Sequence, residues 1–243
     1  MKHIPKPIFL SARWENLILA NYKVDPAVLK PYIPKGTELD FFNHECYISL
    51  VGFNFINTKI LNLTIPFHKN FEEFNLRFYV KYKTAGEWKR GVVFIKEIVP
   101  RPVIAIVANI VYHEPYVFYP MKNKTEISKE NIFVEYSWKI KGNWNFIRAT
   151  AENKEQPITE NSIEEFITEH YWGYNQFSSS VTMEYEVEHP SWTTYSISAF
   201  EIECDYQKIY PAAFSKYLSQ KPASVILAKG SDVLVRKGSK LIF

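Results

Sequence analysis

The sequence predicts a mostly β (α+β) domain, in which mainly antiparallel strands are joined by tight turns and covered by a few packing helices. Segments with the two-residue period of a strand outnumber those with helical period, and glycine-containing turns separate several of them. Helix-start signals are few, and the segments that follow them are short. The 243 residues are 47% hydrophobic, which suffices for one large core, and no repeat or flexible linker divides them. We therefore expect a single domain over residues 1–243.

The first half of the chain carries one short helix signal and one hairpin. Asp25 is a good helix cap followed by proline, so residues 26–31 are expected to form one or two helical turns. Two segments of strand character, 74–83 and 88–99, flank Ala85-Gly86, and glycine tolerates the positive φ of a tight turn. These two segments should therefore pair as antiparallel strands.

The middle of the chain predicts a helix and a second hairpin. Pro102 opens an apolar segment that runs to Tyr112 with helical spacing. The residues expected to pack this helix are Val103, Ile106, Val107, Ile110 and Val111. The segment 133–140 alternates apolar and polar residues, and Lys141-Gly142-Asn143 separates it from an aromatic run that begins at Trp144. This arrangement predicts another antiparallel pair.

The last third of the chain predicts two helices and a strand. Ser162 and Glu165 form a capping box, which predicts a helix through Tyr171, and a final helix is expected over 211–218. Between these helices, the segment 181–188 alternates strictly. Its apolar residues should face the core, while four polar residues should meet water, namely Thr182, Glu184, Glu186 and Glu188.

Charge and composition argue against several classes of partner. The net charge is only +3, and the basic residues are interspersed with acidic ones, so no nucleic-acid or membrane-surface footprint is present. The longest apolar stretch, 103–111, contains Asn109 and reaches about half of the length needed to cross a bilayer. Cys46 and Cys204 suit a reducing compartment, and the chain shows no export signal. We expect a cytoplasmic protein without nucleic-acid or membrane partners, for which a homo-oligomer is left open.

Motifs for cofactors and metals are missing from the sequence. No glycines have dinucleotide-binding spacing, and the Walker-like pair Gly86 and Gly91 is followed by Val92-Val93 instead of the required Lys and Ser or Thr. No serine stands in a nucleophile-elbow motif. The histidines form neither a zinc-protease motif nor a pair one helical turn apart. We therefore expect neither a cofactor nor a metal ion.

One strand carries the strongest candidates for a site. Alternation along 73–80 places four apolar residues on one face. The other face carries Glu73, Asn75, Arg77 and Tyr79. An acid, an amide, a guanidinium and a phenol in one row can fix a polar ligand inside an apolar cavity. The alternative is a solvated outer face with a cross-strand ion pair.

Several segments resemble one protein family. They are Trp14–Pro34, Glu73-x-Asn75-x-Arg77-x-Tyr79-Val80, Gly91–Phe94, Phe166-x-x-Glu169-x-Tyr171 and His189–Trp192. Together and in order, they resemble the YqjF-like family of bacterial proteins, which carry a domain of unknown function. That family is similar in fold to acetoacetate decarboxylase. The resemblance thus implies an acetoacetate decarboxylase-like, cone-shaped closed β-barrel around a hydrophobic cavity.

The resemblance does not extend to the decarboxylase's catalytic lysines. In that enzyme, a lysine after a Tyr-Pro pair forms a Schiff base with the substrate ketone, and an adjacent lysine lowers its pKa. One alignment places Tyr116 and Val117 at these two positions, and another places Met121 and Lys122 there. Neither keeps both lysines, so the resemblance implies the fold without the decarboxylase activity.

Two hypotheses about function follow. The favoured one is that the barrel binds a small, largely apolar molecule whose anionic or polar group pairs with Arg77, with Asn75 and Tyr79 as hydrogen-bonding groups and Glu73 orienting Arg77. Further candidates for the cavity wall or mouth are Arg13, Trp14, Tyr116 and Trp192, with core packing as the alternative role of each aromatic residue. The other hypothesis is a lyase or related enzyme that acts on a small ketone or aldehyde through Lys122, or through acid–base work by Glu73 and Tyr79.

The charge of Arg77 sets a further expectation. A buried guanidinium needs an anionic partner, because an unpaired buried ion costs several kcal/mol. Glu73 lies on the same face, but four residues along a strand span about 13 Å. We expect the partner to be a carboxylate of another strand or of the ligand.

Overall fold

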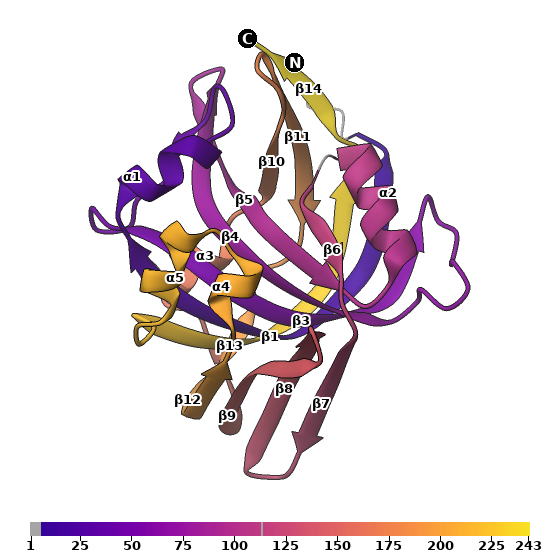
Figure 1. Cartoon of the computed structure of the whole chain (residues 1–243), viewed down its shortest axis with the longest axis vertical. Helices are drawn as coiled ribbons and strands as arrows, with labels where there is room; N and C mark the ends of the chain where they lie inside the picture. The colour runs from indigo at the N-terminus through magenta and orange to yellow at the C-terminus, as the bar shows by residue number, and fades with distance from the viewer. Residues whose placement is uncertain (1–5, 113) are drawn as a thin grey trace.

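The computed structural model describes residues 6–112 and 114–243 and shows long curved strands with short helices outside them (Figure 1). The strands are β1 Ile8–Val24, β2 Glu38–Leu39, β3 Cys46–Ile60, β4 Phe71–Thr84, β5 Glu87–Val99, β6 Tyr116–Phe118, β7 Met121–Ile127, β8 Asn131–Ile140, β9 Asn143–Pro157, β10 Trp172–Ser178, β11 Val181–Glu188, β12 Thr193–Glu203, β13 Ser224–Arg236 and β14 Ser239–Ile242. The helices are α1 Pro26–Leu29, α2 Pro102–Tyr112, α3 Ile163–Thr168, α4 Tyr206–Ile209 and α5 Ala212–Leu218, with one 3-10 turn, η1, at Lys30–Tyr32. None of the described helices is long and apolar enough to cross a membrane.

Seven strands form a closed ring. In the order β11, β10, β5, β4, β3, β1 and β13, each strand pairs with the next, and pairing between β13 and β11 closes the ring. The pairs are antiparallel except the short contact between β10 and β5. Both predicted hairpins, β4–β5 and β8–β9, are present. The prediction of a mostly β, mainly antiparallel closed sheet is therefore confirmed.

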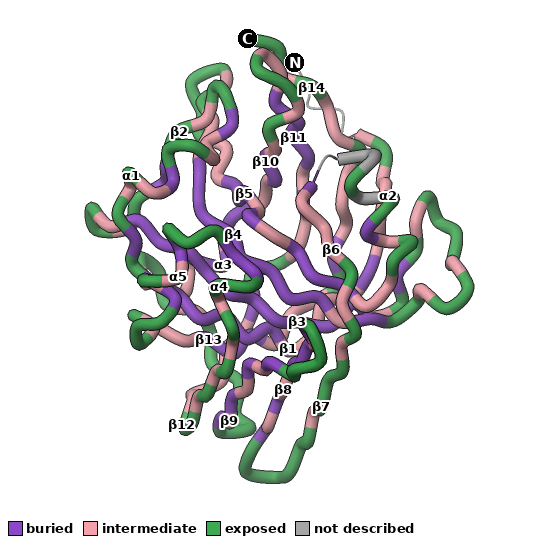
Figure 2. Tube along the Cα trace, in the orientation of Figure 1, coloured by how far each residue is buried: buried purple, intermediate pink, exposed green. Residues whose placement is uncertain are grey.

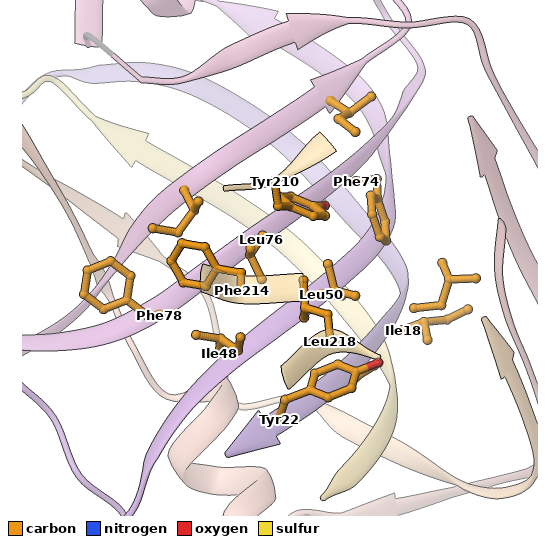
Figure 3. Close-up of a cluster of buried hydrophobic side chains, with 14 of the residues drawn as sticks. Ile18, Tyr22, Ile48, Leu50, Phe74, Leu76, Phe78, Tyr210, Phe214 and Leu218 are labelled. Atoms are coloured by element: carbon orange, nitrogen blue, oxygen red, sulfur yellow. The ribbon is translucent and has the colours of Figure 1, made fainter. Parts of the chain in front are cut away.

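A second layer covers part of the outer face of the ring. The strands β12, β9, β8 and β7 continue the sheet from β13, and their buried residues pack with those of the ring and of α4 and α5. Trp138 of β8 stacks on Phe74 of β4 with 3.8 Å between ring centroids. In Figure 3, Phe214 and Leu218 of α5 lie beside side chains of β3 and β4. This outer core holds the ring strands from outside.

The side chains of β4 divide between two faces, as the alternation predicts. Phe74, Leu76 and Phe78 belong to the outer core (Figure 3). Glu73, Asn75 and Arg77 face the interior of the ring, where they line a cavity. Figure 2 shows β4 buried along most of its length. The polar row is therefore enclosed, and the alternative of a solvated outer face does not apply to it.

Helix α2 has the predicted bounds but packs differently from the prediction. Ile104 and Ala105 contact the inner core, whereas Val103 and Ile106 are 47% and 57% exposed. Val107, Ile110 and Val111 lie outside the described side chains. The helix lies at the edge of the ring (Figure 1), so only part of its apolar surface meets the core.

Two further expectations need correction. Helix α3 starts after the predicted Ser162 cap but ends at Thr168, because Glu169 leaves helical conformation, and Tyr171 lies beyond it. In β11, Thr182 and Glu184 are buried instead of solvated. Glu184 contacts Lys89 at 3.0 Å, because β10 and β5 bring polar partners over this face.

Candidate functional site

A cavity of about 150 Å³ lies inside the ring. Its apolar wall includes Leu17, Val51, Phe53, Phe55, Phe71 and Val92. Ile65 and His68 of the loop between β3 and β4, together with Val103 of α2, line the cavity and keep part of their surface in solvent. These residues mark its mouth. A cavity of this size holds a molecule about as large as benzene.

Polar side chains from adjacent strands form the deep end of this cavity. Across β4 and β5, Asn75 is the register partner of Glu97, which in turn is the partner of Tyr116 across β5 and β6. Glu73 accepts a hydrogen bond from Asn75 Nδ2 at 2.9 Å and another from the Tyr116 hydroxyl at 3.1 Å. The sheet register thus brings together side chains that are far apart in sequence. Glu114, just before β6, adds a third carboxyl group.

Arg77 is buried at this end without a carboxylate partner. Its side chain donates from Nη2 to the carbonyl of Ile167 at 3.2 Å, and its guanidinium lies 5.6 Å from the Tyr79 ring centroid. The residue is 9% exposed, and its Nε has no hydrogen-bond partner. Within the described part of the chain, Arg77 forms no ion pair, although its positive charge opposes the rise in the pKa of Glu73. Of the two partners expected for Arg77, a protein carboxylate forms no ion pair with it among the described residues.

The three carboxyl groups hold protons more tightly than ordinary glutamates do. Burial raises the pKa of Glu73 to about 7, with hydrogen bonds from Asn75 and Tyr116 and the charge of Arg77 limiting the rise. Burial and the charge of Glu73 raise the pKa of Glu114 to about 8, against a hydrogen bond from Tyr185. Burial and the two neighbouring carboxylates raise the pKa of Glu97 well above its ordinary value. Burial thus favours the protonated form of all three acids over that of an ordinary glutamate.

A buried histidine completes the polar end. His170 Nε2 lies 3.2 Å from Asp40 Oδ2, and Arg90 Nε lies 2.6 Å from the same oxygen. Burial lowers the pKa of His170 to about 4, so its ring is neutral at pH 7. The other ring nitrogen, Nδ1, is buried without a partner. It is a free hydrogen-bonding group beside Arg77 in the cavity lining.

An aromatic cluster forms another wall. Trp192 stacks on His189 with 4.3 Å between ring centroids, and Trp14 lies edge-on to Trp192 at 6.2 Å. Trp192 Nε1 donates to Ser231 Oγ at 2.9 Å, whereas Trp14 Nε1 is buried without a partner. A bulge in β1 follows Trp14, where Asn16 has φ of 56°. This wall offers apolar surface and one unused N–H donor.

Some sequence candidates lie outside this cavity lining. Arg13 contacts Glu15 at 2.8 Å and Asp232 at 3.5 Å. The Tyr79 hydroxyl shares a hydrogen bond with Ser49 at 2.6 Å. The exposed Lys122 lies on β7, with its ammonium 4.5 Å from the centroid of the Trp144 ring. The structure therefore brings together Glu73, Asn75, Arg77, Trp14, Tyr116 and Trp192, but not Arg13, Tyr79 or Lys122.

Sequence reasoning missed several polar residues of the cavity, among them Glu97, Glu114, His170 and Tyr185. Glu97 was hidden by a register shift in β5, where Leu76 pairs with Lys96 but Arg77 pairs with Phe94. The residue between them is unpaired, so the inward row continues at Glu97 instead of Lys96. The alternation of segment 181–188 places Tyr185 on the packed face of its strand, and this is the signal by which it could have been found. No local pattern marks Glu114 or His170.

The described residues contain no group of three or more His, Cys, Asp or Glu side chains arranged to hold a metal ion. The three glutamates of the cavity are not arranged in such a group. Their neighbours in the cavity are a tyrosine hydroxyl, an amide and apolar rings. We accordingly consider them as proton-binding groups.

Comparison with solved structures supports the fold. The chain aligns with acetoacetate decarboxylase from Legionella pneumophila at a TM-score of 0.66 and 14% identity, over 98% of this chain and 90% of the enzyme. The enduracididine biosynthesis enzyme MppR, solved in complex with pyruvate, aligns at 0.66 and 13% identity, over 98% and 91%. An acetoacetate decarboxylase-like enzyme from Sphingomonas wittichii aligns at 0.64 and 10% identity, over 97% and 94%. These likenesses confirm the acetoacetate decarboxylase-like fold.

Sequence comparison identifies the family. The uncharacterized protein YqjF of Bacillus subtilis is 27% identical over 197 residues, which cover 78% of this chain and 76% of that protein. Residues 11–232 match the family DUF2071, described as uncharacterized conserved proteins. The match spans all of the cavity's polar residues named above, and the resemblance to YqjF-like proteins is confirmed. This chain therefore belongs to the DUF2071 family.

Proposed function

We propose that the cavity binds a small, largely apolar molecule through an anionic or polar group that pairs with Arg77, without Schiff-base chemistry. The buried guanidinium, which forms no ion pair with any of the described carboxylates, is the observation that carries this proposal. A bound anion would supply the charge that burial requires. The apolar walls favour a hydrocarbon body, and the Asn75 Oδ1 and His170 Nδ1 atoms are unused hydrogen-bonding groups.

The distribution of lysines supports a non-covalent site. No lysine is among the described residues that line the cavity, and Lys122 is exposed on β7. Tyr116, which one alignment places at the position of the Schiff-base lysine, instead donates a hydrogen bond to Glu73. A Schiff base needs an amine that reaches the substrate carbonyl. We infer that this chain does not share the covalent decarboxylase mechanism.

Properties of the whole chain complete the proposal. We infer a bacterial, cytoplasmic protein that acts as one domain over residues 1–243 and has no nucleic-acid or membrane partner; a homo-oligomer is compatible with it. The small net charge and the interspersed basic and acidic residues support the absence of nucleic acid. Cys46 and Cys204 are free thiols, which support a reducing compartment.

Binding of isocaproate tests the role of Arg77. Ligand-observed NMR should show isocaproate binding to the wild type, and the neutral alcohol isohexanol should bind more weakly. Arg77→Met keeps the volume and removes the charge, so the affinity for isocaproate should fall at least about tenfold, because a charged hydrogen bond is lost. The variant should fold with unchanged or higher stability, because an unpaired buried charge is gone.

Arg13→Met is the matched control for this experiment. Arg13 is an arginine of another ring strand, β1, but it is paired with Glu15 and lies outside the cavity lining. Its replacement should leave isocaproate affinity within about a factor of two, which corresponds to well below 1 kcal/mol. Equal affinity of wild type and Arg77→Met for isocaproate would contradict the proposed role of Arg77.

The second candidate function is a lyase or related enzyme that acts on a small ketone or aldehyde in the same cavity. The carboxyl cluster of Glu73, Glu97 and Glu114 favours it, because binding an anion does not by itself require three buried acids. Its covalent version is tested by borohydride reduction in the presence of small ketones and aldehydes. Intact mass should show no adduct above that of a lysozyme control.

A further inference from the structure

We propose that Glu73, Glu97 and Glu114 form a proton-transfer site that enolises a small α-keto acid with an apolar tail, without covalent attachment. This inference rests on the proposed function, because Arg77 would hold the carboxylate of the keto acid. It adds a reaction class and the residues that perform it.

The geometry places the acids where one ligand can meet them. Asn75, Glu97 and Tyr116 are register partners across β4, β5 and β6, and Tyr116 donates to Glu73 at 3.1 Å. The backbone N–H of Glu97 donates to the carbonyl of Pro115 at 3.2 Å, which fixes the segment next to Glu114. All three acids line the same cavity as Arg77. A short keto acid anchored on Arg77 would therefore have its carbonyl end directed toward Glu73 and Glu97.

Within the described part of the chain, no lysine or arginine pairs directly with the cluster. Among the described residues, none of the three glutamates forms an ion pair with a lysine or an arginine, and Glu97 Oε2 is buried without any partner. Three adjacent carboxylates in an apolar cavity would be too costly, so the cluster must share protons. Glu73 has the most support for a negative charge, from Asn75, Tyr116 and the nearby Arg77.

The environments thus separate the acids into different roles. Glu73, whose pKa rises only to about 7, is ready to accept a proton at neutral pH. Glu97 and Glu114, whose pKa values are raised further by burial and by neighbouring carboxylates, keep protons to donate. Acids that differ in this way are a recurring arrangement for general acid–base catalysis. A free carboxyl oxygen on Glu97 leaves room for a bond to the ligand.

The proposed step balances without any other reactant. Glu73 removes a proton from the carbon beside the ketone, and the electron pair of that C–H bond forms the C=C bond of an enol. The carbonyl π electrons take a proton from Glu97 to form the enol hydroxyl. Glu73 becomes neutral as Glu97 becomes a carboxylate, so the charge of the cluster does not change. Reversal returns a proton to carbon, and this proton exchanges with solvent while it is held by Glu73.

Hydrogen exchange at carbon measures this step. Wild-type protein with α-ketoisocaproate in D₂O should lose the proton NMR signal of the methylene beside the ketone faster than the keto acid alone. Glu73→Gln keeps the shape and removes the base, so the exchange rate should fall by about 100-fold or more. Lys122→Met should exchange like the wild type, because no amine takes part.

Binding is measured separately with isocaproate, which lacks the ketone and cannot enolise. Glu73→Gln should bind it within a few-fold of the wild type, and its thermal unfolding checks that it folds. If Glu73→Gln does not fold, Glu97→Gln replaces it and should show the same loss of exchange.

If the wild type binds isocaproate but does not accelerate exchange, this inference is overturned and the proposed function stands. If the wild type fails to bind isocaproate or α-ketoisocaproate at the Arg77 site, the proposed function itself is contradicted. Exchange that survives both glutamine variants shows that the cluster is not the site.

Discussion

The side chain of Tyr116 has a chemical role that differs from that of a catalytic lysine. At a position that resembles that of a catalytic lysine, the chain has a phenol that cannot form a Schiff base. Its hydroxyl instead donates to Glu73 at 3.1 Å. A hydrogen bond to a carboxylate favours the ionised form, so Tyr116 increases the fraction of Glu73 that is ionised, and can act as a base, at neutral pH. The residue therefore positions and tunes an acid within the proposed site.

Replacing Tyr116 with Phe should raise the pKa of Glu73 further above its ordinary value. The variant loses the donated hydrogen bond, while burial of the carboxyl group continues to oppose ionisation. The groups that face Glu73 remain Asn75, Arg77, Glu97 and Glu114. A carboxyl ¹³C NMR titration measures the change, and the pH at which hydrogen exchange reaches half of its maximum should shift upward with it.

Tyr79→Phe provides the control for that titration. Tyr79 is a buried tyrosine on the same face of β4, but its hydroxyl contacts Ser49 and not Glu73. The titration of Glu73 should be unchanged in this variant. A Glu73 midpoint that moves equally in both variants, or in neither, would show that Tyr116 does not tune this acid.

At the scale of elements, a glycine in the paired strands β10 and β11 allows a tyrosine to reach Glu114. Gly173 is the register partner of Tyr185, and a Cβ on Gly173 would lie only 2.0 Å from Cζ of the Tyr185 ring. The missing side chain thus allows the ring to lie across β10. In this position the Tyr185 hydroxyl donates to Glu114. The glycine is required for close approach and not for an unusual φ.

Gly173→Ala should therefore change both stability and the acid cluster. The added methyl group must displace the Tyr185 ring, and overpacking of this kind costs about 1–3 kcal/mol. Loss of the hydroxyl donor should raise the pKa of Glu114 beyond about 8, because that hydrogen bond opposes the effect of burial. Thermal unfolding and ¹³C titration of Glu114 measure the two effects.

Gly52→Ala is a control with the same kind of clash elsewhere. A Cβ there would lie 2.7 Å from the ring of Tyr136, which belongs to the outer core. It should lower stability without moving the Glu114 titration. An unmoved titration in Gly173→Ala would show that Tyr185 does not tune Glu114.

The elements also explain what the sequence could predict. The polar row of β4 follows a strict period of two, so Glu73, Asn75 and Arg77 could be identified from pattern alone. Glu97 could not, because the bulge in β5 shifts the inward row by one residue. His170 follows the end of α3 and meets Asp40 only through tertiary folding. Local pattern therefore fixes a side chain only where the strand stays regular.

At the scale of the whole molecule, the two faces of the ring have different roles. The outer face packs against β8, β9, α4 and α5 in an extensive apolar core. The inner face has its own apolar cluster but leaves a cavity of about 150 Å³ with buried acids. A cavity and buried ionisable groups both reduce stability. The outer core allows the fold to tolerate them, which is a usual condition for a functional site.

This arrangement predicts that stability falls as the pH rises above neutrality. Glu114 has a pKa of about 8 in the folded chain, against an ordinary value of 4.5 that applies when the chain is unfolded. Between these values the folded state binds more protons than the unfolded state, so the free energy of unfolding decreases with increasing pH. His170, with a pKa lowered from 6.5 to about 4, has the opposite effect below pH 6.5. The acid effect should therefore be seen most clearly above that pH.

Urea unfolding between about pH 6.5 and pH 8.5 measures this dependence. One such acid contributes a decrease of up to about 1.4 kcal/mol per pH unit while it stays protonated in the folded state only. Glu114→Gln removes the ionisation, so the variant should have a shallower slope and exceed the wild type in stability at the upper end of the range. Glu130→Gln, at an exposed position, should keep the wild-type slope. A wild-type stability that stays flat or rises over this range, or a Glu114→Gln slope equal to that of the wild type, would show that Glu114 is not a protonated acid in the folded chain.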